Sequence, residues 1–218
     1  MADQNDSGLF REIDEELRQE HYDKLWKRYG SHVIALAVLL VVGVAGFQGW
    51  KSYDLNQRTE SSNTFSQALR LTESNSADAL NALSELSRTG SRGYAMLAGF
   101  REAELLAKNG RRDEAARRYR ALSNDSGLDT LYQDMAAIME AILVLNDAPS
   151  EDLNRRVSSL MADRNPWRHL AREVSALTQL KLGNIDKARE LLTPLKDDQT
   201  APETLRRRAE DLLKGLGS

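Results

Sequence analysis

Between Val33 and Phe47 the chain runs for 15 residues without a charged side chain, and no other stretch of the sequence resembles it. Adding residues 30–32 and 48–50 extends this segment to 21 residues that carry no formal charge unless His32 is protonated. A helix of that length is about 30 Å long, which matches the hydrocarbon thickness of a bilayer. The sequence therefore predicts a helix over residues 30–50 that is able to cross a membrane.

This apolar segment has three possible explanations. A helix buried in a soluble core is rarely apolar on every face at this length. A cleaved signal peptide needs small residues at its end, which Val44–Gly46 would supply, but it also needs a short basic beginning. Here 32 residues with a net negative charge come first, so an uncleaved anchor with aromatic residues at both membrane interfaces is favoured. The predicted anchor residues are Trp26, Tyr29, Val33, Phe47 and Trp50.

The basic residues beside the segment predict its orientation. Lys24, Lys27 and Arg28 lie immediately before it, whereas only Lys51 and Arg58 follow closely. Because Lys and Arg near a span are retained in the cytoplasm, the N-terminus is expected there and the rest of the chain in the periplasm. The expected parts are a cytoplasmic helix at 1–29, a transmembrane helix at 30–50 and a periplasmic domain at 51–218.

The N-terminal arm has the pattern of an amphipathic helix. Phe10, Ile13, Leu17, His21 and Leu25 recur every three or four residues and so share one face. The arm is either a solvated helix that leads into the span or a docking helix for a cytoplasmic partner, and the sequence leaves both open. A close helix partner at Gly43, Gly46 and Gly49 also stays open.

Composition narrows the possible partners. Of the 30 basic and 33 acidic residues, five and eight lie in residues 1–32, so the remainder is electrically neutral. A neutral domain does not indicate a nucleic-acid partner. The chain has no cysteine and only four prolines, which excludes disulfides and thiolate chemistry and favours helices.

Two segments of the C-terminal part repeat one pattern. Ala103–Asp125 and Ala176–Asp198 each contain a helix with small residues, a glycine, an alanine five positions later, and an apolar residue four further on. Their glycines are 73 residues apart, about two units of a helical-hairpin repeat. These glycines are expected to end the first helix of each hairpin with a positive φ. The signature positions are Ala103, Gly110, Ala115 and Tyr119 in one copy and Ala176, Gly183, Ala188 and Leu192 in the other.

Weaker copies lie before, between and after these two. One occupies residues 64–90, and another begins with a helix expected at Met135–Leu145 and closes at Pro166. Residues 202–216 form one amphipathic helix that suits a terminal cap. The pattern resembles tetratricopeptide repeats, although Gly99 and Arg172 stand where their signature tryptophan is expected. The predicted fold is all-α, with an amphipathic arm and one transmembrane helix before a tetratricopeptide-like α-hairpin solenoid.

The sequence offers no catalytic constellation. His21, His32 and His169 fall in the arm, at the membrane edge and in the array, so they are not expected to form one site. No nucleotide-binding, metalloprotease or serine-hydrolase motif is present. We therefore expect no enzyme activity, no cofactor, no metal and no small-molecule substrate.

Two features are candidates for binding a partner protein. Arg111, Arg112, Arg117 and Arg118 crowd one hairpin, where they form either a solvated face or a patch for acidic groups. Trp167 stands at a helix start, where it serves either packing or binding.

The whole chain resembles a bacterial inner-membrane family with a tetratricopeptide-like periplasmic domain, the YfgM-like ancillary subunits of the SecYEG translocon. The residues that carry the resemblance are Phe10–Glu16, Leu25–Gly30, the apolar span, Gly49-Trp50 and the four weak repeats. It implies a single-span protein that works beside the Sec translocon and passes exported chains to periplasmic chaperones. The implied partners are therefore the translocon, those chaperones or unfolded exported clients, while an envelope scaffold for cell division or outer-membrane assembly is the alternative.

Overall fold

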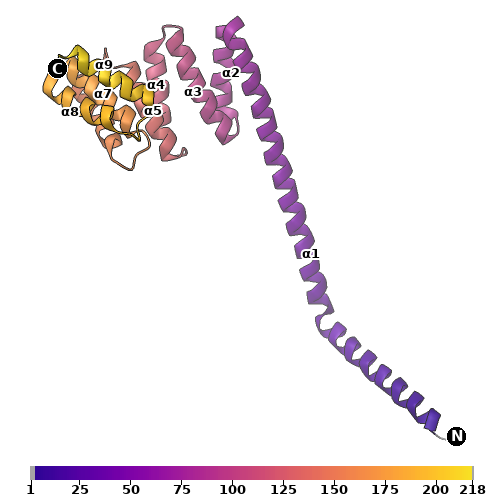
Figure 1. Ribbon diagram of the computed structural model, residues 1–218. Helices are drawn as coiled ribbons and strands as arrows, with labels where there is room; N and C mark the ends of the chain where they lie inside the picture. Colours follow the sequence, from indigo (N-terminus) through magenta and orange to yellow (C-terminus); the bar gives the residue numbers. More distant parts are fainter. Residues whose placement is uncertain (1–2, 218) are drawn as a thin grey trace. The chain divides into compact units, whose positions relative to one another are not determined.

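The computed structural model describes the backbone of residues 3–217 and the side chains of residues 26–217 except 33 and 150. Every regular element in this part of the chain is a helix (Figure 1). The elements are α1 Asp3–Ser74, α2 Ser76–Thr89, α3 Arg92–Lys108, α4 Arg112–Ser123, α5 Thr130–Leu143, α6 Ser150–Ser158, the 3₁₀ turn η1 Ser159–Met161, α7 Arg168–Lys181, α8 Ile185–Asp197 and α9 Glu203–Gly215.

The chain divides into two compact units, Met1–Asn56 and Gln57–Ser218. In the first unit, α1 is helical across both boundaries expected at residues 29/30 and 50/51. Trp26, Tyr29, Phe47 and Trp50 expose more than half of their side-chain surface. The side chain of Val33 and those of the arm residues 10–25 lie outside the described residues.

One helix among the described residues is long and apolar enough to cross a membrane. Its side chains from residue 34 to residue 50 are exposed rather than packed against the protein. Exposure of so many Leu, Val and Ile side chains to water would be unfavourable by about 25 cal/mol for each Å² of apolar surface. The segment is therefore unlike a core helix of a soluble domain.

The second unit is an array of helical hairpins. The end of α1 packs on α2 through Ala68, Ala79 and Leu83, and α3/α4, α5/α6 and α7/α8 form the following pairs. The helix α9 packs on α8 and α7 as the last element. Four hairpins and a terminal helix thus match the order of repeats that the sequence predicts.

The two clear repeats turn in the same way at their glycines. Gly110 and Gly183 have φ angles of 77° and 75°, as expected for residues that end a helix. The N–H of Gly110 donates to Ala107 O at 3.1 Å, and that of Arg111 reaches back to Leu106 O at 2.9 Å. These two hydrogen bonds together form the Schellman motif, which provides donors for carbonyl oxygens that have no partner at the end of a helix.

Small side chains let the paired helices approach closely. Ala103, Ala115, Ala176 and Ala188 are all fully buried, and the apolar residue four positions after each second-helix alanine is buried as well. Helix axes come nearer when the residues at the crossing are small. The residues of the repeat signature are therefore explained by their role in packing the helices together.

The third hairpin differs from the helix expected at Met135–Leu145. Its first helix, α5, begins five residues earlier, because the Asp129 carboxylate accepts a hydrogen bond from Leu131 N at 2.8 Å and caps the helix. Its second helix, α6, ends at Ser158, so Leu160 lies in the 3₁₀ turn η1. Leu160 is nevertheless buried in the core cluster of this hairpin, with Leu153 and Val157.

We expect Gly110→Val to lower the free energy of unfolding by about 1 kcal/mol or more, because a β-branched residue is strained at positive φ. Thermal melting of the full-length protein in detergent, followed by circular dichroism, measures the change. Gly93→Val is the matched control, since Gly93 lies in α3 without a positive φ and an added Cβ would meet nothing within 4 Å. Equal melting temperatures for the two variants would contradict this account of the turn.

Removal of residues 1–50 should leave a folded helical domain that needs no detergent. The reason is that every described core cluster lies between Phe65 and Leu216. Circular dichroism should show a cooperative loss of helix on heating. A gradual, non-cooperative loss would mean that the array depends on the removed residues.

Candidate functional site

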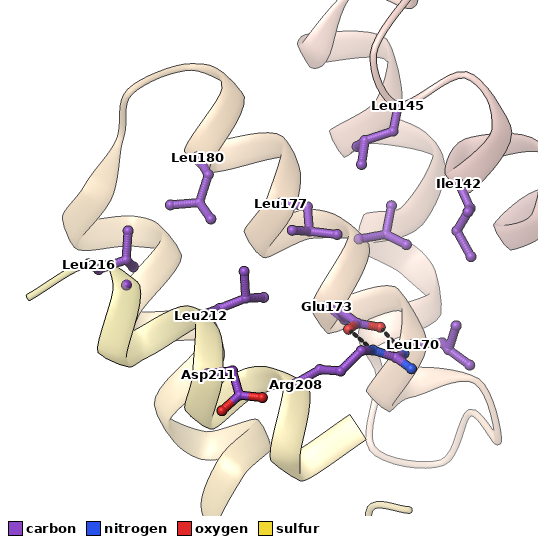
Figure 2. A pocket seen from close by; sticks show the side chains of 12 residues that line it. Ile142, Leu145, Leu170, Glu173, Leu177, Leu180, Arg208, Asp211, Leu212 and Leu216 are labelled. Atoms are coloured by element: carbon purple, nitrogen blue, oxygen red, sulfur yellow. Dashed lines mark hydrogen bonds and ion pairs between the residues drawn. The ribbon is translucent and has the colours of Figure 1, made fainter. Parts of the chain in front are cut away.

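An apolar groove of about 730 Å³ lies between α5, α7 and α9. Figure 2 shows leucine side chains from these helices converging on it, with Glu173 and Arg208 meeting at one side. Ile142 in its wall is 43% exposed, although it is a large apolar residue. The apolar lining comprises Ile142 and Leu145 from α5 and its following turn, Leu170, Val174, Leu177 and Leu180 from α7, and Leu212, Gly215 and Leu216 from α9 and its C-cap.

An ion pair fixes the wall that α9 contributes. Arg208 Nε and Nη2 donate to the two carboxylate oxygens of Glu173, each at 2.7 Å. The side chain of Glu173 is only 8% exposed, so its charge depends on this partner. The hydrogen bond to Glu173 in turn raises the pKa of Arg208. The pair holds α9 against α7 beside the groove.

This groove was not predicted from the sequence. Leu145 was expected only as the end of a helix, and Leu212 and Leu216 only as part of the amphipathic terminal helix. A signal was present in α7, because the small residues Ala171, Ser175 and Thr178 are buried, while the larger Leu170 and Leu177 are only partly buried. Large apolar residues in addition to a buried face of small residues indicate a further contact surface.

Chemically, the groove is able to bury apolar side chains of another molecule. Its three charged residues are Glu173, Arg208 and Asp211, and the first two neutralise each other. Among the described residues, no group of three acidic or histidine side chains is placed to hold a metal ion. His169 is buried near Asp198 and Thr200, and burial lowers its pKa.

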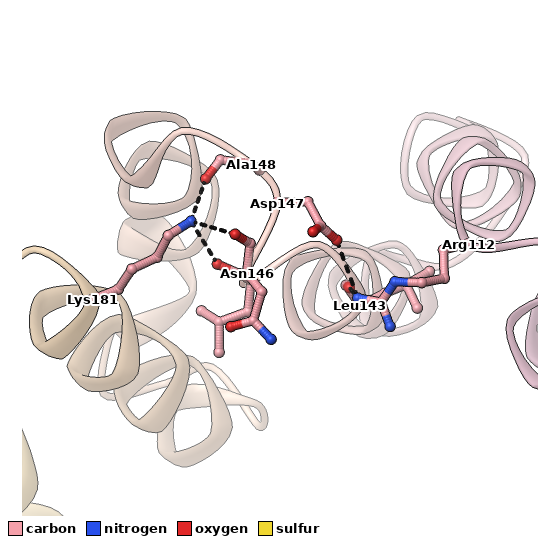
Figure 3. Close-up of polar contacts among 7 residues, drawn as sticks. Arg112, Leu143, Asn146, Asp147, Ala148 and Lys181 are labelled. Carbon is pink, nitrogen blue, oxygen red and sulfur yellow. Dashed lines mark hydrogen bonds and ion pairs between the residues drawn. The ribbon is translucent and has the colours of Figure 1, made fainter. Parts of the chain in front are cut away.

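Arg112, which the sequence offers as a partner residue, contacts the turn between α5 and α6. Figure 3 shows its guanidinium donating to Leu143 O and pairing with Asp147, whose Oδ2 lies 3.3 Å away. From the other side, Lys181 Nζ donates to three carbonyl oxygens of the same turn at 2.9–3.1 Å. Cations at the carbonyl end of a helix stabilise it. Neighbouring hairpins thus hold this turn between them.

Two of the other arginines are also paired within the domain. Arg111 binds Glu114 through two hydrogen bonds, of 2.6 and 2.7 Å, which raise the pKa of Arg111 and lower that of Glu114. Arg118 pairs at 2.7 Å with Glu102 of α3, rather than with the acids of its own helix. Arg117 is exposed and makes no ion pair in the described part of the chain. A partner role for these arginines stays a prediction.

Trp167 is partly buried and packs on the core of the third hairpin. Its indole N–H donates to Leu131 O at 2.8 Å. Both contacts suit the packing alternative of the sequence analysis. A role as a binding anchor stays a prediction.

A buried charge that the sequence analysis missed joins three helices. Glu140 of α5 is 2% exposed, and its Oε1 accepts hydrogen bonds from Arg120 of α4 and Arg156 of α6, each at 2.5 Å. Two cations on one carboxylate stabilise a charge that would otherwise be costly to bury. Arg120 and Arg156 are 20 and 16 positions from Glu140 in the sequence, so only the tertiary structure brings the three residues together.

We expect Arg208→Met to lower the free energy of unfolding by about 2 kcal/mol, because it leaves the buried Glu173 carboxylate without its partner. Urea unfolding of the full-length protein in detergent measures the loss. Arg207→Met is the matched control: Arg207 is exposed on the same helix and lies 3.8 Å from the exposed Glu203, so a change within about 0.5 kcal/mol is expected. Equal effects of the two substitutions would mean that the ion pair does not hold α9.

Comparisons with known proteins agree with the helical-hairpin fold. A family model described as a tetratricopeptide repeat-like domain matches residues 23–190. Searches of curated proteins and of solved structures gave no match. The matched range begins within α1, includes its apolar segment and ends within α8, and so covers more than three quarters of the sequence. The chain therefore belongs to the tetratricopeptide repeat-like domain family.

Proposed function

We propose that this chain is a membrane-anchored interaction protein that uses its helical hairpins to bind other proteins. The observation that carries the proposal is the joining, in one chain, of a span-length apolar helix and a tetratricopeptide repeat-like domain. Domains of this class generally mediate protein–protein contacts, because stacked hairpins present long surfaces made of side chains. The groove between α5, α7 and α9 gives this chain such a surface.

The finer proposal concerns the place of action. The basic residues before the span support an N-terminus in the cytoplasm and a hairpin array in the periplasm of a bacterial inner membrane. The resemblance to ancillary subunits of the Sec translocon supports a position at the translocon exit. There the array would receive exported chains and pass them to periplasmic chaperones, as a non-enzymatic co-chaperone.

Affinity purification of the full-length protein from membranes in mild detergent, followed by mass spectrometry, tests this proposal. We expect translocon subunits and periplasmic folding factors to co-purify with it. The matched control is a chain in which residues 30–50 are replaced by an unrelated apolar span of equal length. If the native span docks on the translocon, the control loses the translocon subunits but keeps the periplasmic factors. Recovery of division or outer-membrane assembly proteins instead would support the envelope-scaffold alternative and contradict a role in secretion.

A further inference from the structure

The groove between α5, α7 and α9 has properties that specify its occupant. We propose that it binds an amphipathic helix of a partner protein, one that carries an apolar stripe and a basic residue beside that stripe. This inference rests on the proposed protein-binding function and names the kind of segment that is bound. The lining, the length and the charge of the groove specify this occupant.

The lining requires an occupant with apolar side chains. Nine of its 12 residues are Ile, Leu, Val or Gly. Burial of apolar surface is favourable by about 25 cal/mol per Å², and Ile142 alone leaves 43% of its surface to water. A partner that covers these residues with its own apolar side chains removes both surfaces from water.

The lining also favours a helix over an extended segment. Apart from Leu145 and Leu216, the lining residues lie on helices whose backbone groups are bonded within each helix, and the lining contains no Asn, Gln, Ser or Thr. An extended segment would bring unpaired N–H and C=O groups against this surface, where few partners exist for them. A helix satisfies its own backbone and presents only side chains.

The length of the groove fits about three helical turns. On α7 the lining runs from Leu170 to Leu180, which corresponds to about 15 Å along the helix axis. Apolar residues at positions i, i+3 or i+4, i+7 and i+10 or i+11 of a partner helix span a similar distance, about 15 Å. Gly215 lies in the opposite wall, and a Cβ built on it would meet nothing within 4 Å, so the groove has open space for a partner side chain there.

Charge on the α9 wall of the groove supplies the second feature of the occupant. Glu173 and Arg208 are paired with each other, which leaves the carboxylate of Asp211. Its side chain is 77% exposed, and Lys214 Nζ lies 3.9 Å away but donates at 2.7 Å to Glu210. A lysine or arginine flanking the apolar stripe of the partner would complement Asp211.

The test uses the full-length protein in nanodiscs of zwitterionic lipid, immobilised on a biosensor, with empty nanodiscs subtracted. The probe is a peptide of about 15 residues with Leu three and four positions apart and Lys between them, long enough to form a helix. There are two comparison peptides. One has a Pro at its centre, and the other has Glu in place of Lys. We expect the Leu/Lys peptide to bind, the Pro peptide not to bind, and the Glu peptide to bind more weakly.

Matched variants locate the binding. Gly215→Leu should weaken binding of the Leu/Lys peptide by about tenfold or more, because the new side chain fills the groove. Gly93→Leu is its control, since Gly93 is exposed on α3 outside the groove and also has open space for a side chain. Asp211→Lys should weaken binding of the Leu/Lys peptide and strengthen that of the Glu peptide. Glu190→Lys on α8, an exposed residue outside the groove, should change neither.

Three outcomes would overturn the inference. Equal affinities of Gly215→Leu and Gly93→Leu would place the binding elsewhere. Equal affinities of the Pro and Leu/Lys peptides would mean that an extended segment is bound. If the wild-type chain self-associates and Gly215→Leu makes it monomeric, the groove binds a second copy of this chain instead. These measurements involve no translocon subunit, so they separate failure of this inference from failure of the proposed role in secretion.

Discussion

The close approach of helices at alanine residues is the constraint on which the array depends. Ala103, Ala115, Ala176 and Ala188 are fully buried, and each allows its helix to lie nearer to its neighbours than a larger side chain would. The short distance between the helices determines where their longer side chains lie on the surface of the array. On α7, Ala176 is buried among residues of α8 and α9, while Leu170, Leu177 and Leu180 of the same helix line the groove.

Much of the charge in the second unit serves the same packing. Glu102–Arg118 joins α3 to α4, Glu140 joins α5 to both α4 and α6, and Glu173–Arg208 joins α7 to α9. Each pair includes a carboxylate that is largely withdrawn from water. Removing one partner from such a pair is more costly than breaking an exposed pair. A dense run of arginines in this chain thus reflects contacts between hairpins as well as contact with solvent.

Periodicity in the sequence predicted the helical class, the order of the hairpins and the positive φ of Gly110 and Gly183. These features are local, because a turn and an apolar stripe are determined by residues within about ten positions. The start of α5 was wrong by five residues because the Asp129 cap lies before the apolar pattern. The groove and the Glu140 cluster were not predictable in the same way, since they depend on helices that meet only in the folded array. The partner roles of the arginines and of Trp167 stay predictions.

The position of α9 has a genetic consequence. This last helix supplies one wall of the groove and also Arg208, the partner of Glu173. A premature stop codon after Arg207 would leave the sequence of all four hairpins intact, yet it would delete that wall and strand a buried carboxylate. Such an allele would change the domain in two ways at once, since α7 would lose both the helix packed beside it and the partner of its buried charge.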